Sequence, residues 1–254
     1  MPDSGRRLWP AAASAALITG LLATTAYGAV ITGTPGNDRI HGHAQGDQIS
    51  ALTGDDRVHG RRGGDTIDLG PGADVAWGGR GNDTIGGFAG PDRIHGNQGA
   101  DVLQGDVPNV GDLTSKDRLF GGRGPDQVSG GDGDDFMSGG FGHDRQDGGA
   151  GNDTIFANQG RDVTDGGDGN DRLFALSRKD VFRPHDSNGD TVRGGNGDDR
   201  IAVRDGERDV VNCGPGVDKA ILDFKDVTED NSCEVVTRHR PNRADSRIED
   251  RNED

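Results

Sequence analysis

The sequence predicts an all-β fold in which short strands stack into a parallel solenoid. Three observations support this prediction: an aspartate recurs every nine residues, glycine supplies 46 of 254 residues, and nearly every nonapeptide holds one apolar residue. The aspartates run from Asp38 to Asp101 and from Asp117 to Asp180, and Asp190 and Asp199 follow after a one-residue slip. A fixed short period indicates stacked units that contact mainly their neighbours.

Composition excludes a conventional layered core. Hydrophobic residues are 30% of the chain, aromatic residues are 4%, and the net charge is −16. Low hydrophobicity with high charge is also typical of disorder, but the strict period favours order once a counter-ion is present. The excess of acid argues against nucleic acid as a partner, because phosphate binding needs a basic surface.

The N-terminus has the pattern of an export signal over residues 1–28. Arg6 and Arg7 precede an apolar, alanine-rich stretch over 8–22, and small residues follow, with cleavage expected after Ala26 or Gly28. A retained membrane anchor is the alternative, although it needs about 20 apolar residues. We expect a secreted or cell-surface chain without stable membrane insertion, exported by the general or the twin-arginine route.

The best repeats read Gly-Gly-x-Gly-x-Asp-x-U-x, where U is apolar. Gly78 to Ile85 and Gly130 to Met137 are two examples. The chain resembles the RTX (hemolysin-type) family from about Gly33 to Ala202. The resemblance implies a parallel β-roll with two nonapeptides per coil and several Ca²⁺ ions between stacked turns.

Each part of the repeat has a physical role. Glycine permits the left-handed backbone of a tight turn, and x-U-x forms a short strand with U facing inward. The U positions are Ile40, Ile49, Val58, Ile67, Ile85, Ile94, Leu103, Leu119, Val128, Met137, Ile155, Leu173, Phe182, Val192 and Ile201. Ala76, Gln146 and Thr164 depart from the pattern, so we expect weak rungs there.

Stacked strands lie about 4.8 Å apart, so aspartates 18 residues apart repel by roughly 3 kcal/mol per pair at an effective dielectric of 20. Ca²⁺ relieves this repulsion because it accepts six to eight oxygen ligands, and Mg²⁺ ranks second. We therefore expect metal binding and folding to be one event. The alternative is that the aspartates only cap turns. The candidate ligands are Asp38, Asp47, Asp56, Asp65, Asp74, Asp83, Asp92, Asp101, Asp117, Asp126, Asp135, Asp144, Asp153, Asp162, Asp171, Asp190 and Asp199.

Two breaks interrupt the period. Residues 105–116 contain seven extra residues, which we interpret as a loop. Residues 183–189 contain one extra residue, and the repeat before them has lost its glycines, so Asp180 is a doubtful ligand. The repeats that end at Asp47 and Asp56 lack the double glycine, which predicts weaker sites near the N-terminus.

One outward face carries an aromatic and arginine ladder. Its columns are His41, His59, Trp77, His95, Phe120, Ser138, Phe156 and Phe174, and Arg39, Arg57, Val75, Arg93, Arg118, Phe136, Thr154 and Arg172. Stacking that steadies the strands is one interpretation, and a contact face for a polymer, lipid or protein is another. A zinc site at His41 and His59 lacks an evident third ligand.

The C-terminal part departs from the period. We expect residues 203–238 to cap the sheet edge and to be fastened by a Cys213–Cys233 disulfide, which suits an exported chain. Residues 239–254 are almost wholly polar or charged, which predicts a disordered tail.

No catalytic motif is evident, because neither an HExxH nor a GxSxG sequence occurs. The sequence therefore favours a secreted calcium-binding protein with a structural or interaction role and no catalytic activity. The alternatives are a solenoid polysaccharide-modifying enzyme and an accessory fragment of a toxin or adhesin system. Glycine-rich, arginine-over-lysine composition weakly resembles that of exported actinobacterial proteins.

Overall fold

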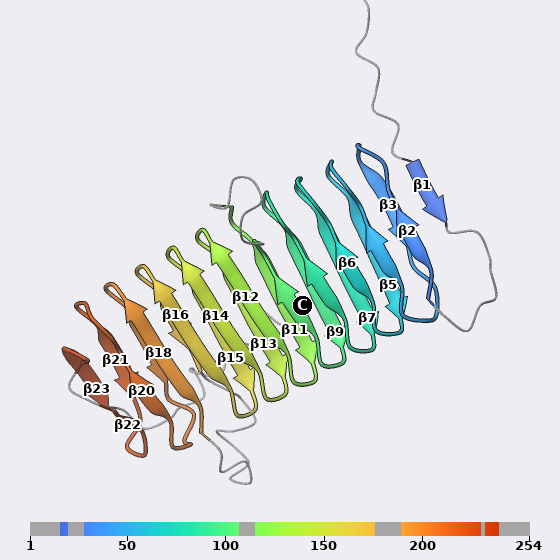
Figure 1. The fold of residues 1–254 in the computed structure, drawn as a ribbon. Helices are drawn as coiled ribbons and strands as arrows, with labels where there is room; N and C mark the ends of the chain where they lie inside the picture. The colour runs from blue at the N-terminus through green and yellow to red at the C-terminus, as the bar shows by residue number, and fades with distance from the viewer. Residues whose placement is uncertain (1–15, 20–27, 107–114, 176–188, 230–231, 239–254) are drawn as a thin grey trace, which may run out of the picture.

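The chain folds into a parallel β-solenoid in a computed structural model (Figure 1), which describes residues 16–19, 28–106, 115–175, 189–229 and 232–238. Its strands form two sheets, one of 12 strands and one of 11, and consecutive strands alternate between them. The predicted all-β, parallel β-roll is confirmed. Within the described residues, no helix is long and apolar enough to cross a membrane.

The odd-numbered strands form the first sheet, here called sheet A. They are β1 (Ala16–Thr19), β3 (Asp38–His41), β5 (Arg57–Arg62), β7 (Val75–Arg80), β9 (Arg93–Gln98), β11 (Arg118–Arg123), β13 (Phe136–Phe141), β15 (Thr154–Gln159), β17 (Arg172–Phe174), β19 (Arg200–Val203), β21 (Lys219–Leu222) and β23 (Val235–Arg238). The even-numbered strands form sheet B. They are β2 (Val30–Thr32), β4 (Gln48–Ser50), β6 (Thr66–Asp68), β8 (Thr84–Gly86), β10 (Val102–Gln104), β12 (Gln127–Asp132), β14 (Arg145–Ala150), β16 (Val163–Asp168), β18 (Thr191–Asn196), β20 (Val210–Asn212) and β22 (Val227–Thr228).

The register confirms two nonapeptides per coil. Ile40 pairs with Val58 in sheet A, and Ile49 pairs with Ile67 in sheet B, so stacked residues are 18 apart. Every predicted inward residue that the structure describes is at most 2% exposed. These side chains form one thin core between the two sheets. Phe182 lies outside the described residues.

The three departures from the apolar pattern still form rungs. Ala76 is fully buried, and Gln146 and Thr164 are 1% and 2% exposed. Gln146 Nε2 donates to the Phe156 carbonyl at 3.1 Å, and Thr164 Oγ1 donates to Gln146 Oε1 at 3.4 Å. Internal hydrogen bonds therefore satisfy this buried pair, and both strands keep their pairing.

The first break leaves the stack intact. Strand β9 pairs with β11, and β10 pairs with β12, so the coils join directly across the extra residues. Gly105 and Asp106 still bond to the next coil, through Gly105 N to the Ser129 carbonyl and Asp106 N to the Gly130 carbonyl, at 2.9 Å each. The faces predicted on either side of the loop therefore keep their order. Residues 107–114 lie outside the described residues.

The second break is larger than predicted. Strand β16 pairs directly with β18, so Thr164 stacks on Val192, 28 residues later instead of 18. The predicted one-residue insertion is therefore wrong, because ten extra residues separate these two coils. The repeat of Asp180 lacks the glycines that a tight turn requires, which explains why the stack passes it by. Asp180 itself lies outside the described residues.

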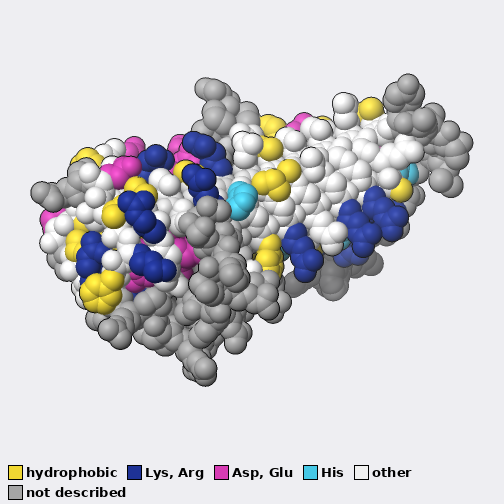
Figure 2. Space-filling view, turned by 90° about the horizontal axis from the view of Figure 1, so that it is seen from below, with side chains coloured by type: hydrophobic (Ala, Val, Ile, Leu, Met, Phe, Trp, Pro, Cys, Tyr) yellow, Lys and Arg dark blue, Asp and Glu magenta, His cyan; other side chains and the backbone are white. Residues whose placement is uncertain are grey.

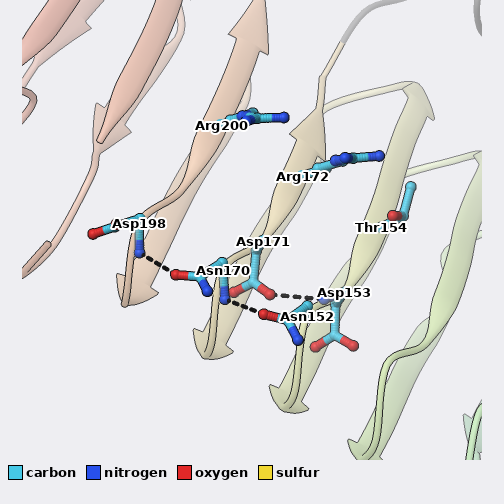
Figure 3. A pocket seen from close by; sticks show the side chains of 8 residues that line it. All are labelled: Asn152, Asp153, Thr154, Asn170, Asp171, Arg172, Asp198 and Arg200. Atoms are coloured by element: carbon cyan, nitrogen blue, oxygen red, sulfur yellow. Dashed lines mark hydrogen bonds between the residues drawn. The ribbon is translucent and has the colours of Figure 1, made fainter. Parts of the chain in front are cut away.

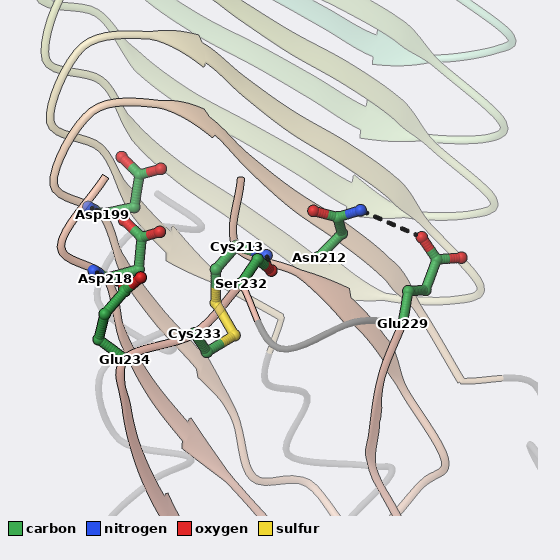
Figure 4. Close-up of a disulfide and its surroundings, with 8 residues drawn as sticks. All are labelled: Asp199, Asn212, Cys213, Asp218, Glu229, Ser232, Cys233 and Glu234. Carbon is green, nitrogen blue, oxygen red and sulfur yellow. Dashed lines mark hydrogen bonds between the residues drawn. A yellow bond between two sulfur atoms is a disulfide. The ribbon is translucent and has the colours of Figure 1, made fainter. Parts of the chain in front are cut away.

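The C-terminal segment continues the same two sheets. Strands β20 to β23 each pair with the strand two before them, so the strand pairing has no boundary at residue 202. These strands are the last coils of the solenoid, and the role of residues 203–238 as a cap of the sheet edge stays a prediction. The Cys213–Cys233 disulfide is confirmed and lies at this end (Figure 4). The tail over 239–254 lies outside the described residues.

At the opposite end, β1 lies within the segment predicted as a signal peptide and pairs with β3, so that β1 is the edge strand of sheet A. Residues 1–15 and 20–27 of that segment lie outside the described residues.

Candidate calcium site

The structure brings all 17 predicted aspartates together in two columns, one for each sheet, and every one of them is buried. The column beside sheet A contains Asp38, Asp56, Asp74, Asp92, Asp117, Asp135, Asp153, Asp171, Asp199 and Asp218. The column beside sheet B contains Asp47, Asp65, Asp83, Asp101, Asp126, Asp144, Asp162, Asp190, Asp209 and Asp226.

The two oxygens of each carboxylate have different roles, as Asp126 shows. Its Oδ1 accepts a hydrogen bond of 2.8 Å from the backbone N–H of Asp101, one coil earlier. Its Oδ2 is buried and has no hydrogen-bond partner. The same unpartnered Oδ2 recurs at Asp56, Asp65, Asp74, Asp83, Asp92, Asp101, Asp117, Asp135, Asp144, Asp153, Asp171 and Asp199. In these thirteen carboxylates, turn capping therefore accounts for one oxygen and leaves the other without a hydrogen-bond partner.

The double glycine makes room for this carboxylate. A Cβ on Gly121 would lie 2.6 Å from Asp126 Oδ2 and 2.5 Å from the Gly139 carbonyl oxygen, closer than atoms can approach. Gly122 has φ of +111°, which side chains rarely adopt. The first glycine is thus required for close approach and the second for backbone shape. Carboxylate and carbonyl oxygens consequently crowd into one small space.

Burial raises the pKa of these carboxyl groups. It raises the pKa of Asp126 to about 8 and that of Asp92 to about 9, and the neighbouring carboxylates of each column add to the shift. Most of the other column aspartates have a pKa of about 6 to 8 for the same reasons. Ionised carboxylates at these positions therefore need a positive partner.

The donor set fits Ca²⁺. Between neighbouring turns, unpartnered carboxylate oxygens lie close to backbone carbonyl oxygens such as that of Gly139. Ca²⁺ binds six to eight oxygen ligands with tolerant geometry, whereas Mg²⁺ requires a stricter octahedron. A cation here would supply the charge that the buried oxygens lack.

The first two aspartates differ from the rest. Asp38 Oδ2 accepts a 2.5 Å hydrogen bond from the Thr34 N–H, and Asp47 Oδ2 accepts one of 2.5 Å from the His43 N–H. Thr34 Oγ1 donates to Asp38 Oδ1 at 3.0 Å, and Ala29 N donates to Asp47 Oδ1 at 2.6 Å, so both oxygens of each of these two carboxylates have protein partners. Weaker sites near the N-terminus remain a prediction, which this difference supports for Asp47 but not for Asp56, whose Oδ2 has no hydrogen-bond partner.

Sequence reasoning missed the end of both columns. Asp209, Asp218 and Asp226 continue them, and Glu234 accepts the last hydrogen bond, of 2.6 Å, from Asp218 N. The stacked separations here are 19, 19, 17 and 16 residues instead of 18. A search that allowed slips of one or two residues would have found these acids.

An outer row of polar side chains runs beside the sheet A column (Figure 3). Asn170 N donates to Asn152 Oδ1 at 3.0 Å, and Asp198 N donates to Asn170 Oδ1 at 2.7 Å. With Arg172 and Arg200 these residues line a groove of about 490 Å³ across neighbouring coils. The outer row caps the turns a second time, so the turns hold their shape on both sides of the inner carboxylates.

The aromatic ladder forms on sheet A as predicted. His41, His59, Trp77, His95 and Phe120 stack in order, with ring centroids 4.3 to 5.9 Å apart. At Ser138 the column has no ring, and Phe136 from the adjacent column bridges it instead, 5.8 Å from Phe120 and 5.5 Å from Phe156. Phe174 ends the ladder, 4.8 Å from Phe156. Burial, with nearby Arg93 and Arg118, lowers the pKa of His95 to about 4, so this ring is neutral at pH 7.

Arginines on sheet A stack on one another. Four neighbouring pairs occur, namely Arg39 with Arg57, Arg93 with Arg118, Arg172 with Arg200, and Arg62 with Arg80. All eight are exposed, and within the described chain none of them forms an ion pair. Like charges on adjacent strands are destabilising. Figure 2 shows one face on which Lys and Arg side chains gather in groups, while Asp and Glu side chains show mainly toward the C-terminal end.

Two columns of buried carboxylates, set in the turns of a two-sheet parallel solenoid, define a calcium-binding β-roll. The chain belongs to the family of RTX calcium-binding nonapeptide repeats, whose model matches residues 25–58, 50–85, 86–107, 114–146, 147–173 and 186–207. These repeats bind Ca²⁺. Comparison with curated proteins gives no significant match.

Proposed function

We propose that this chain is an exported calcium-binding protein in which Ca²⁺ binding and folding are one event. The observation that carries the proposal is the repeated, buried and unpartnered Oδ2 atom of the column aspartates. The thin apolar core between the two sheets does not offset the cost of burying so many unpartnered carboxylates, whereas bound Ca²⁺ does. Extracellular modules bind Ca²⁺ at about 10⁻⁴–10⁻³ M, and a chain with this affinity would fold only after it leaves a calcium-poor compartment.

Small-angle X-ray scattering of the full chain tests this coupling. We expect an expanded chain after calcium removal and an elongated rod in millimolar Ca²⁺, with no compaction in equal Mg²⁺. A radius of gyration that does not respond to Ca²⁺ contradicts the proposal. Export is tested separately, by locating the chain in cell and medium fractions when residues 1–28 are present or deleted.

We further propose that sheet A binds an anionic polysaccharide. The unpaired arginine columns supply guanidinium groups, which bind carboxylate or sulfate groups in a bidentate manner. The half-buried aromatic ladder beside them offers ring faces for sugars. The same positions on sheet B carry mainly small or polar residues such as Ser50, Thr66 and Gln104, so the two faces differ. Binding, rather than catalysis, is the role that this arrangement supports.

Binding to dextran sulfate, with neutral dextran as the matched polymer, tests this face in saturating Ca²⁺. The variant R57Q/R93Q removes two exposed arginines of sheet A, and R145Q/R193Q removes two of sheet B. At about 1 kcal/mol for each exposed ionic contact, the sheet A variant loses more than about tenfold in affinity. Equal affinity of the two variants contradicts the assignment of the face.

A further inference from the structure

One acidic cluster differs from all the regular repeats. Asp190, Asp205 and Asp209 each direct a carboxylate oxygen to one place, and these oxygens lie within 4.8 Å of one another. In the described part of the chain, this is the one group of three metal-ligating side chains that converge so closely. Two ligands of a single Ca²⁺ at about 2.4 Å cannot lie farther apart than this distance.

The third carboxylate comes from an altered repeat. Asp199 and Asp209 are ten residues apart instead of nine, and Val203 and Arg204 replace the double glycine. In the repeat that begins at Gly130, the residue at the position of Asp205 is Asp132, which is exposed. Asp205 is instead 2% exposed and holds the turn by accepting a 2.9 Å hydrogen bond from Glu207 N. The altered turn therefore directs inward an acid that a regular repeat directs to solvent.

A second observation points to a ligand. Asp209 is fully buried, and its Oδ2 has no hydrogen-bond partner, whereas its Oδ1 accepts a bond from Asp190 N at 2.7 Å. The charges that act on Asp209 most are those of Asp205, Asp226 and Glu207, which are all negative. Lys225 reaches this turn, where its Nζ donates a hydrogen bond to the Gly206 carbonyl.

We propose that Asp190, Asp205 and Asp209 form a distinct Ca²⁺ site that fills before the sites of the regular repeats. The site binds one hard divalent cation through three carboxylates that come from two coils. A regular repeat supplies only the aspartates of its column. Affinity for Ca²⁺ rises with the number of charged ligands and with the rigidity of the site. The proposal rests on calcium binding by the roll but adds to two column aspartates a third ligand, Asp205, that the nonapeptide pattern does not direct inward.

Competition between the full chain and a fluorescent Ca²⁺ chelator tests the proposal. We expect one equivalent of Ca²⁺ to bind at a concentration at least about tenfold lower than the remaining equivalents, in line with three charged ligands. Asp205→Asn removes this first equivalent and leaves the others. Asp132→Asn, which changes the exposed acid at the matching position, leaves the whole titration unchanged.

The outcomes are distinguishable. A first equivalent that survives in Asp205→Asn, or a single class of sites in the wild-type chain, overturns this proposal and leaves the calcium roll intact. A wild-type chain that binds no Ca²⁺ overturns both. If Asp205→Asn does not fold in high Ca²⁺, anomalous diffraction from wild-type crystals grown in Ca²⁺ decides. A peak among the three carboxylates supports the site, and its absence beside occupied columns refutes it.

Discussion

The metal-free chain should respond to pH in the opposite direction from an ordinary acidic protein. Burial raises the pKa of the column carboxyls, to about 7 at Asp74 and about 8 at Asp135. A group whose pKa is raised on folding contributes stability that is fully present below its unfolded pKa, near 4, and is lost as pH rises through its folded pKa. Without metal, the roll is therefore more stable at pH 5 than at pH 7.5.

The size of the effect follows from the same shifts. A pKa raised from 3.8 to about 7 destabilises the metal-free roll by roughly 4 kcal/mol at pH 7 and above, because each unit is about 1.4 kcal/mol. Lowering the pH from 7 to 5 returns roughly 2 kcal/mol for each such group. The combined effect of three or four such groups is comparable to the whole free energy of unfolding of a typical domain, which is about 5–15 kcal/mol. Asp83, Asp117, Asp144, Asp171 and Asp199 share this value.

Urea unfolding followed by circular dichroism measures this dependence. Calcium is removed on a chelating resin, so that no acid-sensitive chelator remains, and unfolding is compared at pH 5 and pH 7.5. We expect more β structure and a higher midpoint at pH 5. In saturating Ca²⁺ the order reverses, because protons then compete with the metal. A metal-free chain whose stability rises with pH refutes the reasoning.

Three further substitutions or treatments test separate parts of the structure. Gly121→Ala places a Cβ 2.6 Å from Asp126 Oδ2, so the number of Ca²⁺ ions bound per chain, measured by calorimetry, should fall by about one. The control is Gly36→Ala, whose Cβ meets only Thr34 Oγ1 at 4.0 Å and which should leave this number unchanged. Reduction of Cys213–Cys233, which closes a separation of 20 residues, should lower unfolding free energy by about 3 kcal/mol, and an unchanged urea midpoint contradicts this. Gln146→Leu alone should destabilise the roll by about 1–3 kcal/mol, because it removes the hydrogen-bond partner of buried Thr164. Combining it with Thr164→Val should recover most of the lost stability, as measured by thermal unfolding.

Much of the fold could be predicted because one period governs both sheets. The spacing of Ile40, Val58 and their successors determines which strands stack, and the aspartates of the same repeats fall into columns as a consequence. The outward ladder was predictable for the same reason, apart from the bridge that Phe136 makes beside Ser138.

The errors lie where spacing alone does not decide the fold. Whether the repeat of Asp180 joins the stack depends on turn glycines that it lacks, and a one-residue slip could not reveal that the stack passes it by. Past residue 202, the aspartates no longer recur every nine residues along the sequence. Asp209 and Asp218 still lie in the columns, because turns of slightly different length place their carboxylates at the same position in each coil. The burial of the Asp205 carboxylate likewise depends on a turn that is one residue longer than in a regular repeat.

Far-UV circular dichroism of residues 29–254 during a Ca²⁺ titration, with Mg²⁺ as the control ion, tests the central claim most directly. Coupled binding and folding predicts a cooperative gain of β signal near millimolar Ca²⁺ and no such gain with Mg²⁺. A chain that shows the full β spectrum at neutral pH after calcium removal, and that Ca²⁺ leaves unchanged, would contradict it.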